Sequence, residues 1–321
     1  MTALAQAIGT ENMTFEPFPW LLAYFRQIYT HRVDLTADGV QLFPLSAEQL
    51  LSEALHLAFS YDGLHWTALN RNQPIFTPGD NQRIRDPFIR RGRDGNFHLL
   101  ATGGWAVTGM YYARSNDLIH WTDERTLPIM EQVPAARNVW APEFIFDAQH
   151  NQYLVYWSSS RGKNGWDDSR IWYAHTLDFQ TFSPPRVLFD PGYTVIDATI
   201  VPLSDACYMF FKDERFGHVH GEHRYIQVAA APSLAGPYAC VTAAVTPSIT
   251  EGPTVMRAPE SGQWYLMYDH CMDNRYGVSV SEDLLNWRVV DDIEFPPNAR
   301  HGSVFSVTER ELAKLREHWG E

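Results

Sequence analysis

One turn motif recurs along this sequence, and its repetition constrains the fold more than any other feature. In each complete copy a Ser or Thr precedes an aspartate by two positions, and an aromatic residue follows after a short spacer. An apolar, strand-like run comes before every copy, so each predicts the turn of a β-hairpin. The copies are FSYDGLHW (59–66), RSNDLIHW (114–121), HTLDFQTF (175–182), the degenerate AAPSLAGPY (230–238) and VSEDLLNW (280–287).

Two further sets of apolar segments follow the same period. The set directly upstream of the turns is WLLAYF (20–25), FHLLA (97–101), YLVYW (153–157), YMFF (208–211) and WYLMY (264–268). The set of first strands is IRDPFI (84–89), WAPEFIF (140–146), VIDATIV (195–201), TEGPTVM (250–256) and RHGSVFSV (300–307). Each unit therefore supplies about four short strands over about 50–60 residues, which is the size of a β-propeller blade.

The two ends of the chain complement each other. The N-terminal region supplies a second strand and an outer hairpin without a first strand, whereas residues 300–307 supply a first strand alone. Together they complete a fifth blade, and a ring closed in this way hides strand edges that invite aggregation. We therefore predict an all-β protein, a five-bladed β-propeller that forms a single domain over residues 1–321.

Two segments outside the repeat have helical character. They are SAEQLLSEAL (46–55) and TERELAKLREHW (308–319). In the second segment Thr308 and Glu311 predict a capping box, and the apolar residues that follow share one face. We expect short peripheral helices at both places.

Composition and charge exclude several classes of protein. Hydrophobic residues make up 45% of the chain and aromatic residues 14%, which suits a large β-rich core and excludes disorder. The formal net charge of −13 disfavours a nucleic-acid partner, because an acidic surface repels phosphate backbones. The three cysteines are too few and too far apart for a disulfide framework or a thiolate metal site.

The N-terminal segment predicts where the protein resides. It lacks the basic start and apolar run of a signal peptide, and no stretch of the chain approaches the ~20 apolar residues of a membrane span. We therefore expect a cytoplasmic protein without a membrane partner. Its oligomeric state is left open.

One polar side chain lies near the start of each predicted first strand. Asp86, Glu143, Asp197, Glu251 and His301 follow one another at intervals of 57, 54, 54 and 50 residues. Because first strands line the axis of a propeller, we expect these side chains to converge at one mouth of the channel. Carboxylates so close together raise one another's pKa or need a cation, and stability gives no reason for such a cluster.

Each of these residues also has a structural explanation when taken alone. Asp86 and Asp197 could each begin a strand, Glu251 could be an exposed turn acid, and His301 could be a hydrogen-bonded core histidine. Their common register favours a functional cluster. Several carboxylates around a sugar-sized site suggest glycoside cleavage, in which one acid protonates the leaving oxygen and another activates water.

The ordered motifs RDPFI, WAPEFIF, IDATIV, EGPTVM and RHGSV resemble the successive blade motifs of glycoside hydrolase family 43. The resemblance implies a five-bladed propeller and inverting hydrolysis of arabinose- and xylose-containing glycans. By the same resemblance Asp86 is the general base and Glu251 the general acid. Asp197 is expected to orient Glu251 and to keep its pKa high.

Further residues are assigned by the resemblance or by residue type. His301 resembles an axial histidine that approaches a hydrated calcium or another cation, which would relieve the carboxylate repulsion. Trp140 and Trp105 are candidate sugar platforms, because aromatic faces stack on sugar C–H faces, although each could belong to the core or the rim. Glu143 is a candidate substrate contact. No organic cofactor is expected.

Arg85 and Arg300 flank the predicted base and histidine. They could bind hydroxyls or carboxylates, but alternation along a strand could also point them away from the axis, so they receive no role. About 80 residues precede the strand that carries the base, unlike in many family members. The loops around the site are therefore left unassigned.

We expect an exo-acting α-L-arabinofuranosidase whose partner is an oligosaccharide substrate. A β-xylosidase or an endo-arabinanase of the same family is an alternative. Fructan- and sucrose-cleaving propellers also carry an RDP motif, but they need a nucleophile one blade earlier, where WLLAYF has no carboxylate. A lectin-like propeller that binds glycans without cleaving them is the alternative from another class, and the presence of Asp86, Asp197 and Glu251 argues against it.

Overall fold

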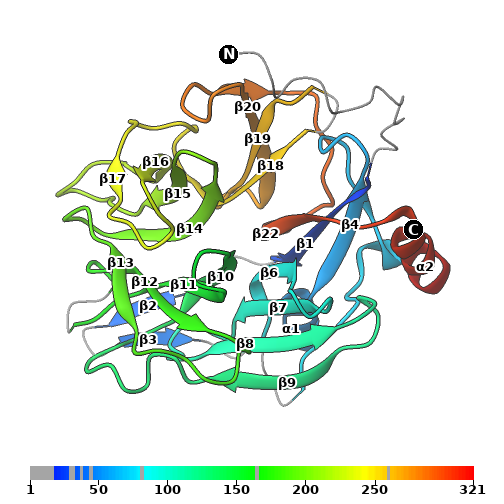
Figure 1. Ribbon diagram of the computed structural model, residues 1–321, viewed down its shortest axis with the longest axis horizontal. Helices are drawn as coiled ribbons and strands as arrows, with labels where there is room; N and C mark the ends of the chain where they lie inside the picture. The colour runs from blue at the N-terminus through cyan, green and yellow to red at the C-terminus, as the bar shows by residue number, and fades with distance from the viewer. Residues whose placement is uncertain are drawn as a thin grey trace, which may run out of the picture.

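The computed structural model describes residues 18–28, 33–36, 39–42, 46–79, 83–162, 166–258 and 261–321. Within these residues the chain forms five four-stranded antiparallel sheets and one two-stranded hairpin. The sheets are arranged as blades around a common centre (Figure 1). The predicted five-bladed propeller is confirmed, whereas a single domain over residues 1–321 stays a prediction because it includes residues outside these ranges.

Four blades use strands that are consecutive in the sequence. The first blade contains β6 (Arg85–Arg91), β7 (Phe97–Thr102), β8 (Met110–Ser115) and β9 (Thr122–Leu127). The second contains β10 (Trp140–Asp147), β11 (Gln152–Ser159), β12 (Arg170–Thr176) and β13 (Arg186–Phe189). The third contains β14 (Val195–Pro202), β15 (Cys207–Asp213), β16 (Tyr225–Ala231) and β17 (Ala239–Cys240). The fourth contains β18 (Thr250–Arg257), β19 (Trp264–His270), β20 (Arg275–Ser281) and β21 (Arg288–Val290).

The fifth blade joins the two ends of the chain, as the sequence predicted. Its strands are β22 (Ala299–Ser306), β1 (Trp20–Arg26), β4 (His56–Ser60) and β5 (Thr67–Ala68), in that order from the centre outward. Gly302 makes the pairing of β22 with β1 possible, since a Cβ at this position would lie 1.9 Å from the carbonyl oxygen of Ala23.

The first strands of the blades form the inner ring. The strands β6, β10, β14, β18 and β22 contact one another in this order, and β22 contacts β6 to close the ring (Figure 1). Apolar side chains pack between neighbouring sheets: Phe88 and Tyr112 of the first blade share one cluster with Phe144 and Trp157 of the second. The core therefore lies between the blades, and the inner strands are left to position polar groups at the centre.

The recurring turn motif builds the same hydrogen-bonded turn in each complete copy. In the second copy Ser115 Oγ accepts hydrogen bonds from the backbone N–H groups of Asp117 and Leu118. The carboxylate of Asp117 accepts from the N–H groups of Ile119 and His120, each at 2.9 Å. Leu118 takes a positive φ of 65° to allow this turn. The same bonds form around Asp62, Asp178 and Asp283.

The peripheral helices agree only partly with the prediction. The helix α2 (Glu309–Trp319) begins with the predicted capping box at Thr308. The helix α1 (Ala47–Ser52) is shorter than predicted, because the residues after it take other partners: the buried carboxylate of Glu53 binds Arg83 and Arg85, and the backbone of Leu55 pairs with that of Phe76.

The remaining regular elements are short. They are the hairpin of β2 (Val33–Thr36) and β3 (Gly39–Leu42), and the 3₁₀ helix η1 (Asn70–Asn72). None of the helices in the described ranges is long and apolar enough to cross a membrane.

We expect the substitution Asp117→Ala to lower the free energy of unfolding by about 1–3 kcal/mol, because two backbone N–H groups lose a charged acceptor. Urea denaturation at pH 7 measures the change. The control is Asp205→Ala, in an exposed turn where the described structure gives the aspartate side chain no hydrogen bond. Equal stability of the two variants would contradict the structural role of the motif.

Candidate active site

A β-bulge interrupts the inner strand of each of the four consecutive blades, where the candidate carboxylates lie. The strand register shifts between Arg85 and Phe88, and at the matching places in β10, β14 and β18. The backbone there adopts positive φ angles, which cost energy in residues other than glycine and often mark functional sites. The residues with positive φ are Asp86 (49°), Ala141 (45°), Asp197 (54°) and Gly252 (61°).

The sequence predicted that the five polar residues occupy equivalent positions in their inner strands, and this prediction is only partly correct. Asp86 and Asp197 occupy the same position in their bulges. Glu251 comes one residue before the equivalent Gly252, and Glu143 comes two residues after the equivalent Ala141. The bulges thus give each carboxylate a different depth and direction, although all of them come from the inner ring.

Asp86 is fixed by its own blade and by the closing blade. Its Oδ2 atom accepts a hydrogen bond of 2.6 Å from Thr102 Oγ1, and its Oδ1 atom lies 3.5 Å from His301 Nδ1. Thr102 Oγ1 also accepts from the N–H of Ala141, so the second blade helps to hold this hydroxyl. The Asp86 side chain is 14% exposed and can therefore be reached by water.

His301 lies between two carboxylates. Its Nδ1 atom is 3.5 Å from Asp86 and 3.7 Å from Asp197, and its backbone N–H donates to Asp269 at 2.7 Å. The ring packs against the backbone of Gly252, where a Cβ atom would lie 2.5 Å from the ring. Burial alone would lower the pKa of His301, but Asp197 and Asp86 outweigh it and raise the pKa above its ordinary value. These contacts favour the imidazolium form.

Asp197 is the most buried of the three proposed catalytic carboxylates, with 7% of its side chain exposed. Its backbone N–H donates to Ser158 Oγ, and its Oδ2 atom accepts from the N–H of Gly252 at 3.3 Å. Burial raises the pKa of Asp197 to about 7, and the neighbouring charge of Glu251 adds to this effect while His301 opposes it. Asp197 therefore holds a proton over much of the range below neutral pH.

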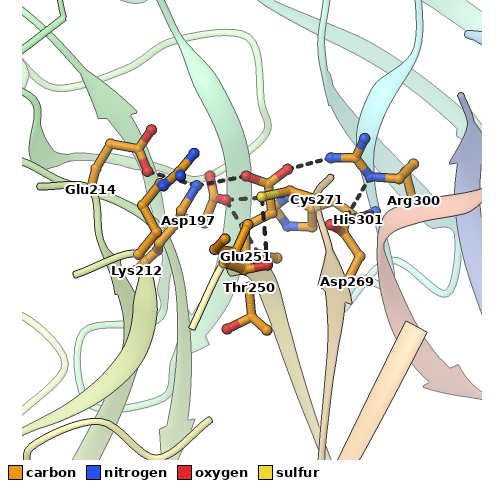
Figure 2. A network of polar contacts seen from close by, with 12 residues as sticks. Asp197, Lys212, Glu214, Thr250, Glu251, Asp269, Cys271, Arg300 and His301 are labelled. Carbon is orange, nitrogen blue, oxygen red and sulfur yellow. Dashed lines mark hydrogen bonds and ion pairs between the residues drawn. The ribbon is translucent and has the colours of Figure 1, made fainter. Parts of the chain in front are cut away.

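Glu251 is clamped between two cations, as Figure 2 shows. Its Oε2 atom lies 2.7 Å from Lys212 Nζ, and its Oε1 atom lies 2.5 Å from Arg300 Nη2. Burial alone would raise the pKa of Glu251, but the charges of Lys212 and Arg300 outweigh it and hold the pKa well below its usual range. In the free protein Glu251 is therefore a carboxylate.

This order of pKa values corrects the sequence prediction for Asp197 and Glu251. We expected Asp197 to keep the pKa of Glu251 high, but Glu251 is the ionised member and Asp197 the member with the raised pKa. The reason is the pair of cations, Lys212 and Arg300, whose attraction exceeds the repulsion between the carboxylates.

Glu143 does not share this accessible centre. The residue is 5% exposed, and its carboxylate accepts a hydrogen bond of 2.5 Å from the hydroxyl of Tyr156, which in turn accepts from the N–H of Ile200. Burial raises the pKa of Glu143 to about 7. Its position below the bulge of β10 makes it a buried link between the second and third blades, contrary to the predicted substrate contact.

The two predicted platforms form part of one aromatic cluster. Trp140 Nε1 donates to the carbonyl oxygen of Trp105, and the two rings meet edge to face at 5.6 Å. The ring of Trp166 lies 4.6 Å from that of Trp140. All three side chains are partly exposed. Because Trp140 directly precedes Ala141, whose N–H binds the hydroxyl that holds Asp86, the cluster adjoins the candidate base.

The described side chains do not fit a directly bound metal ion. No group of three His, Cys, Asp or Glu among the described residues has the geometry of metal ligands, and Nδ1 of His301 faces two carboxylates. The positive charge at the centre comes from His301, Lys212 and Arg300. A hydrated calcium near His301 stays a prediction.

The sequence analysis missed three residues of this site. Thr102 ends β7 without any distinguishing pattern, and Arg300 was left without a role because strand alternation allowed either direction. Lys212 had a usable signal: it directly follows the apolar run CYMFF of β15. A lysine at the end of a buried strand needs a carboxylate partner, and this requirement could have pointed to Glu251.

A comparison with known families assigns the chain. A family profile described as "Probable glycosyl hydrolase domain", related to glycoside hydrolase family 43, matches residues 42–313. The chain belongs to this glycosyl hydrolase family. The matched region contains every inner strand, and with them every candidate carboxylate.

Individual relatives of this glycosyl hydrolase are more distant. An α-L-arabinofuranosidase of Bifidobacterium longum subsp. longum is 29% identical over 178 residues, which cover 46% of this chain and 17% of that much longer protein. A thermostable family-43 glycoside hydrolase gives a TM-score of 0.54 at 20% identity, covering 68% of this chain and 78% of that one. An α-L-arabinofuranosidase from Lactobacillus brevis gives 0.55 at 18% identity, covering 72% and 81%. At these identities the structures show a shared fold.

We expect Gly252→Ala to destabilise this glycosyl hydrolase by more than a matched glycine substitution, because the new Cβ would collide with the His301 ring in a backbone of positive φ. The control is Gly192→Ala, at a φ of +88° with nothing within 4 Å of the new Cβ. In urea denaturation the free energy of unfolding should fall by about 1 kcal/mol for the control and by clearly more for Gly252→Ala. Equal losses would show that His301 does not need this glycine.

Proposed function

We propose that this glycosyl hydrolase removes terminal α-L-arabinofuranosyl residues from arabinose-containing oligosaccharides with inversion of configuration. One observation carries the proposal: Asp86, Asp197 and Glu251 come from three different blades and meet around His301 and its neighbours at the inner ring. Inverting hydrolysis needs one group that takes a proton from water and another that protonates the leaving oxygen.

Asp86 is the proposed general base. Its carboxylate is oriented by Thr102, faces the imidazole of His301 and is partly exposed. A carboxylate held in this way can take a proton from water while the water oxygen attacks the anomeric carbon. His301 supports this role because its Nδ1 atom lies 3.5 Å from Asp86 Oδ1 and so helps to orient this carboxylate.

Asp197 and Glu251 together are the proposed proton source for the leaving oxygen. Asp197 carries the raised pKa, and Glu251 is the more exposed member of the pair, at 19% compared with 7%. Since their charges interact, the two residues titrate as a coupled pair, in which Asp197 holds the proton in the free protein. We assign Glu251 to the substrate side of the pair and Asp197 to the buried side.

The proposed base and the acid pair come from different strands of the inner ring. The proposed base is on β6 and the acid pair is on β14 and β18, and in the inner ring β22 with His301 stands between β6 and β18. An inverting mechanism requires room between base and acid for a water molecule.

Two observations support an arabinofuranoside as the substrate. Part of this chain is similar in sequence to the Bifidobacterium longum α-L-arabinofuranosidase. The α-L-arabinofuranosidase from Lactobacillus brevis shares the fold. The cluster of Trp105, Trp140 and Trp166 next to Asp86 offers aromatic faces for a small sugar ring. β-Xylosides and longer arabinans are the alternative substrates that an activity screen separates.

We expect the purified protein to hydrolyse p-nitrophenyl α-L-arabinofuranoside and arabino-oligosaccharides. Asp86→Asn should lower kcat on both by about 10²–10⁴-fold, because attack needs a base whatever the leaving group. Glu251→Gln should lower kcat far more on the oligosaccharide, since p-nitrophenolate leaves without a proton. Initial rates measured with product chromatography test both expectations.

The control for these variants is Glu143→Gln, which should keep most of the activity because this carboxylate is buried against Tyr156. Asp197→Asn should resemble Glu251→Gln in its dependence on the leaving group. A wild-type protein that binds arabino-oligosaccharides without cleaving any glycoside tested would overturn the proposed function in favour of a glycan-binding propeller.

A further inference from the structure

Lys212 is an unusual residue in this chain. The sequence contains three lysines and 22 arginines, and Lys212 lies near the end of β15 with 2% of its side chain exposed. Burying an ammonium group costs several kcal/mol unless carboxylates compensate for the lost hydration. A lysine in this place therefore needs partners, and its partners lie at the candidate active site.

The side chain of Lys212 joins two carboxylates. Its Nζ atom lies 2.7 Å from Glu251 Oε2 and 2.6 Å from Glu214 Oε2. On the far side of Glu251, Arg300 binds Oε1 at 2.5 Å and also binds Asp269 at 3.0 Å. Figure 2 shows the resulting row of alternating charges. Glu251 stands in the middle of the row, with one cation on each carboxylate oxygen.

The row crosses three blades, so its geometry is set by the fold and not by one loop. Lys212 comes from β15 of the third blade, Glu251 and Asp269 come from β18 and β19 of the fourth, and Arg300 comes from β22 of the closing blade. Each oxygen of Glu251 has its own cation, so the carboxyl group cannot rotate without breaking an ion pair. This arrangement fixes the orientation as well as the charge of Glu251.

We propose that Lys212 is a positioning residue of the acid pair: its buried ammonium group, together with Arg300, fixes the Glu251 carboxylate in place and in its charged form. Glu214 serves as the second counter-ion that keeps Lys212 charged. This inference rests on the proposed function for its catalytic consequence, although the ionisation of Glu251 can be measured without any activity.

Other charged groups also face this row and take part in its titration. Burial alone would lower the pKa of Lys212, but Glu214 and Glu251 outweigh it and hold the pKa well above its ordinary value. Lys212 in turn lowers the pKa of Asp197. The titratable groups that face the row are Asp197, Glu222, Arg224, Cys271, Tyr276 and His301.

The alternative is that Lys212 only stabilises the fold as a buried ion pair. The two roles differ in one observable, the pH at which Glu251 takes up a proton. A structural ion pair changes the unfolding free energy when it is removed, whereas a positioning cation also sets the titration of its carboxylate. Stability alone therefore cannot distinguish them.

The direct test is ¹³C NMR of protein labelled at the glutamate carboxyl carbon, with the Glu251 signal identified by its absence in Glu251→Gln. In the wild type this signal should stay that of a carboxylate through the acid range where exposed glutamates titrate, about pH 4. In Lys212→Met its midpoint should rise by about 1–3 pH units, because one of two opposite charges is lost. An unchanged midpoint in Lys212→Met would overturn the proposal.

Two control variants accompany this experiment. Lys212→Arg keeps the charge and should leave the midpoint low. Arg215→Met removes a nearby cation that pairs with Asp213 instead, and should not move it. If Lys212→Met does not fold, the double variant Lys212→Met with Glu214→Gln removes the ammonium together with its second counter-ion, and the same rise is expected.

The kinetic arm uses the pH dependence of kcat/KM on an arabino-oligosaccharide. The wild-type rate should fall as pH rises through about 7, where Asp197 loses its proton. In Lys212→Met this alkaline limb should move to higher pH, since loss of a nearby cation raises the pKa of either member of the pair. If the alkaline limb of the kcat/KM profile stays in place in Lys212→Met while the Glu251 NMR midpoint rises, the catalytic role of Lys212 is overturned. A wild type without activity would instead refute the proposed function and leave the NMR result to decide on Lys212.

Discussion

The central constraint on this molecule is the accumulation of negative charge where five strands meet. Asp86, Asp197 and Glu251 converge at the inner ring, and such a group is unstable without compensation. Compensation comes from His301 between the two aspartates, and from Lys212 and Arg300 on either side of Glu251. Lys212 and Arg300 also hold the pKa of Glu251 low, whereas burial raises the pKa of Asp197. The cations that neutralise the charge therefore also help to give these two carboxylates different protonation states.

The fold creates this arrangement through the closing blade and the bulges. Pairing β1 with β22 brings both His301 and Arg300 to the centre, although they lie close to the C-terminus. The bulges of β6 and β14 turn Asp86 and Asp197 toward His301 at the cost of positive φ angles. Gly252 supplies the space for the histidine ring. The strain is tolerated because the apolar packing between the blades determines the positions of the strands.

The sequence was sufficient for the architecture but not for the electrostatics. Strand order, ring closure and the capping box at Thr308 follow from local patterns, which are repeated or depend on few residues. The positions of Glu143 and Glu251 relative to the bulges of their strands could not be predicted, because a bulge adds a residue without a sequence signature. The ionisation of Glu251 depends on Lys212 and Arg300, which come from other blades, so only the folded chain reveals it.

The stereochemistry of the released sugar tests the central claim most directly, because it depends on a separate base and acid pair around His301. Proton NMR can follow the first minutes of hydrolysis of an α-L-arabinofuranoside, before the anomers interconvert. The account predicts that the first product has the anomeric configuration opposite to that of the cleaved linkage. A first product with retained configuration would contradict it, because Asp86 or Glu251 would then act as a nucleophile and not as a partner of water.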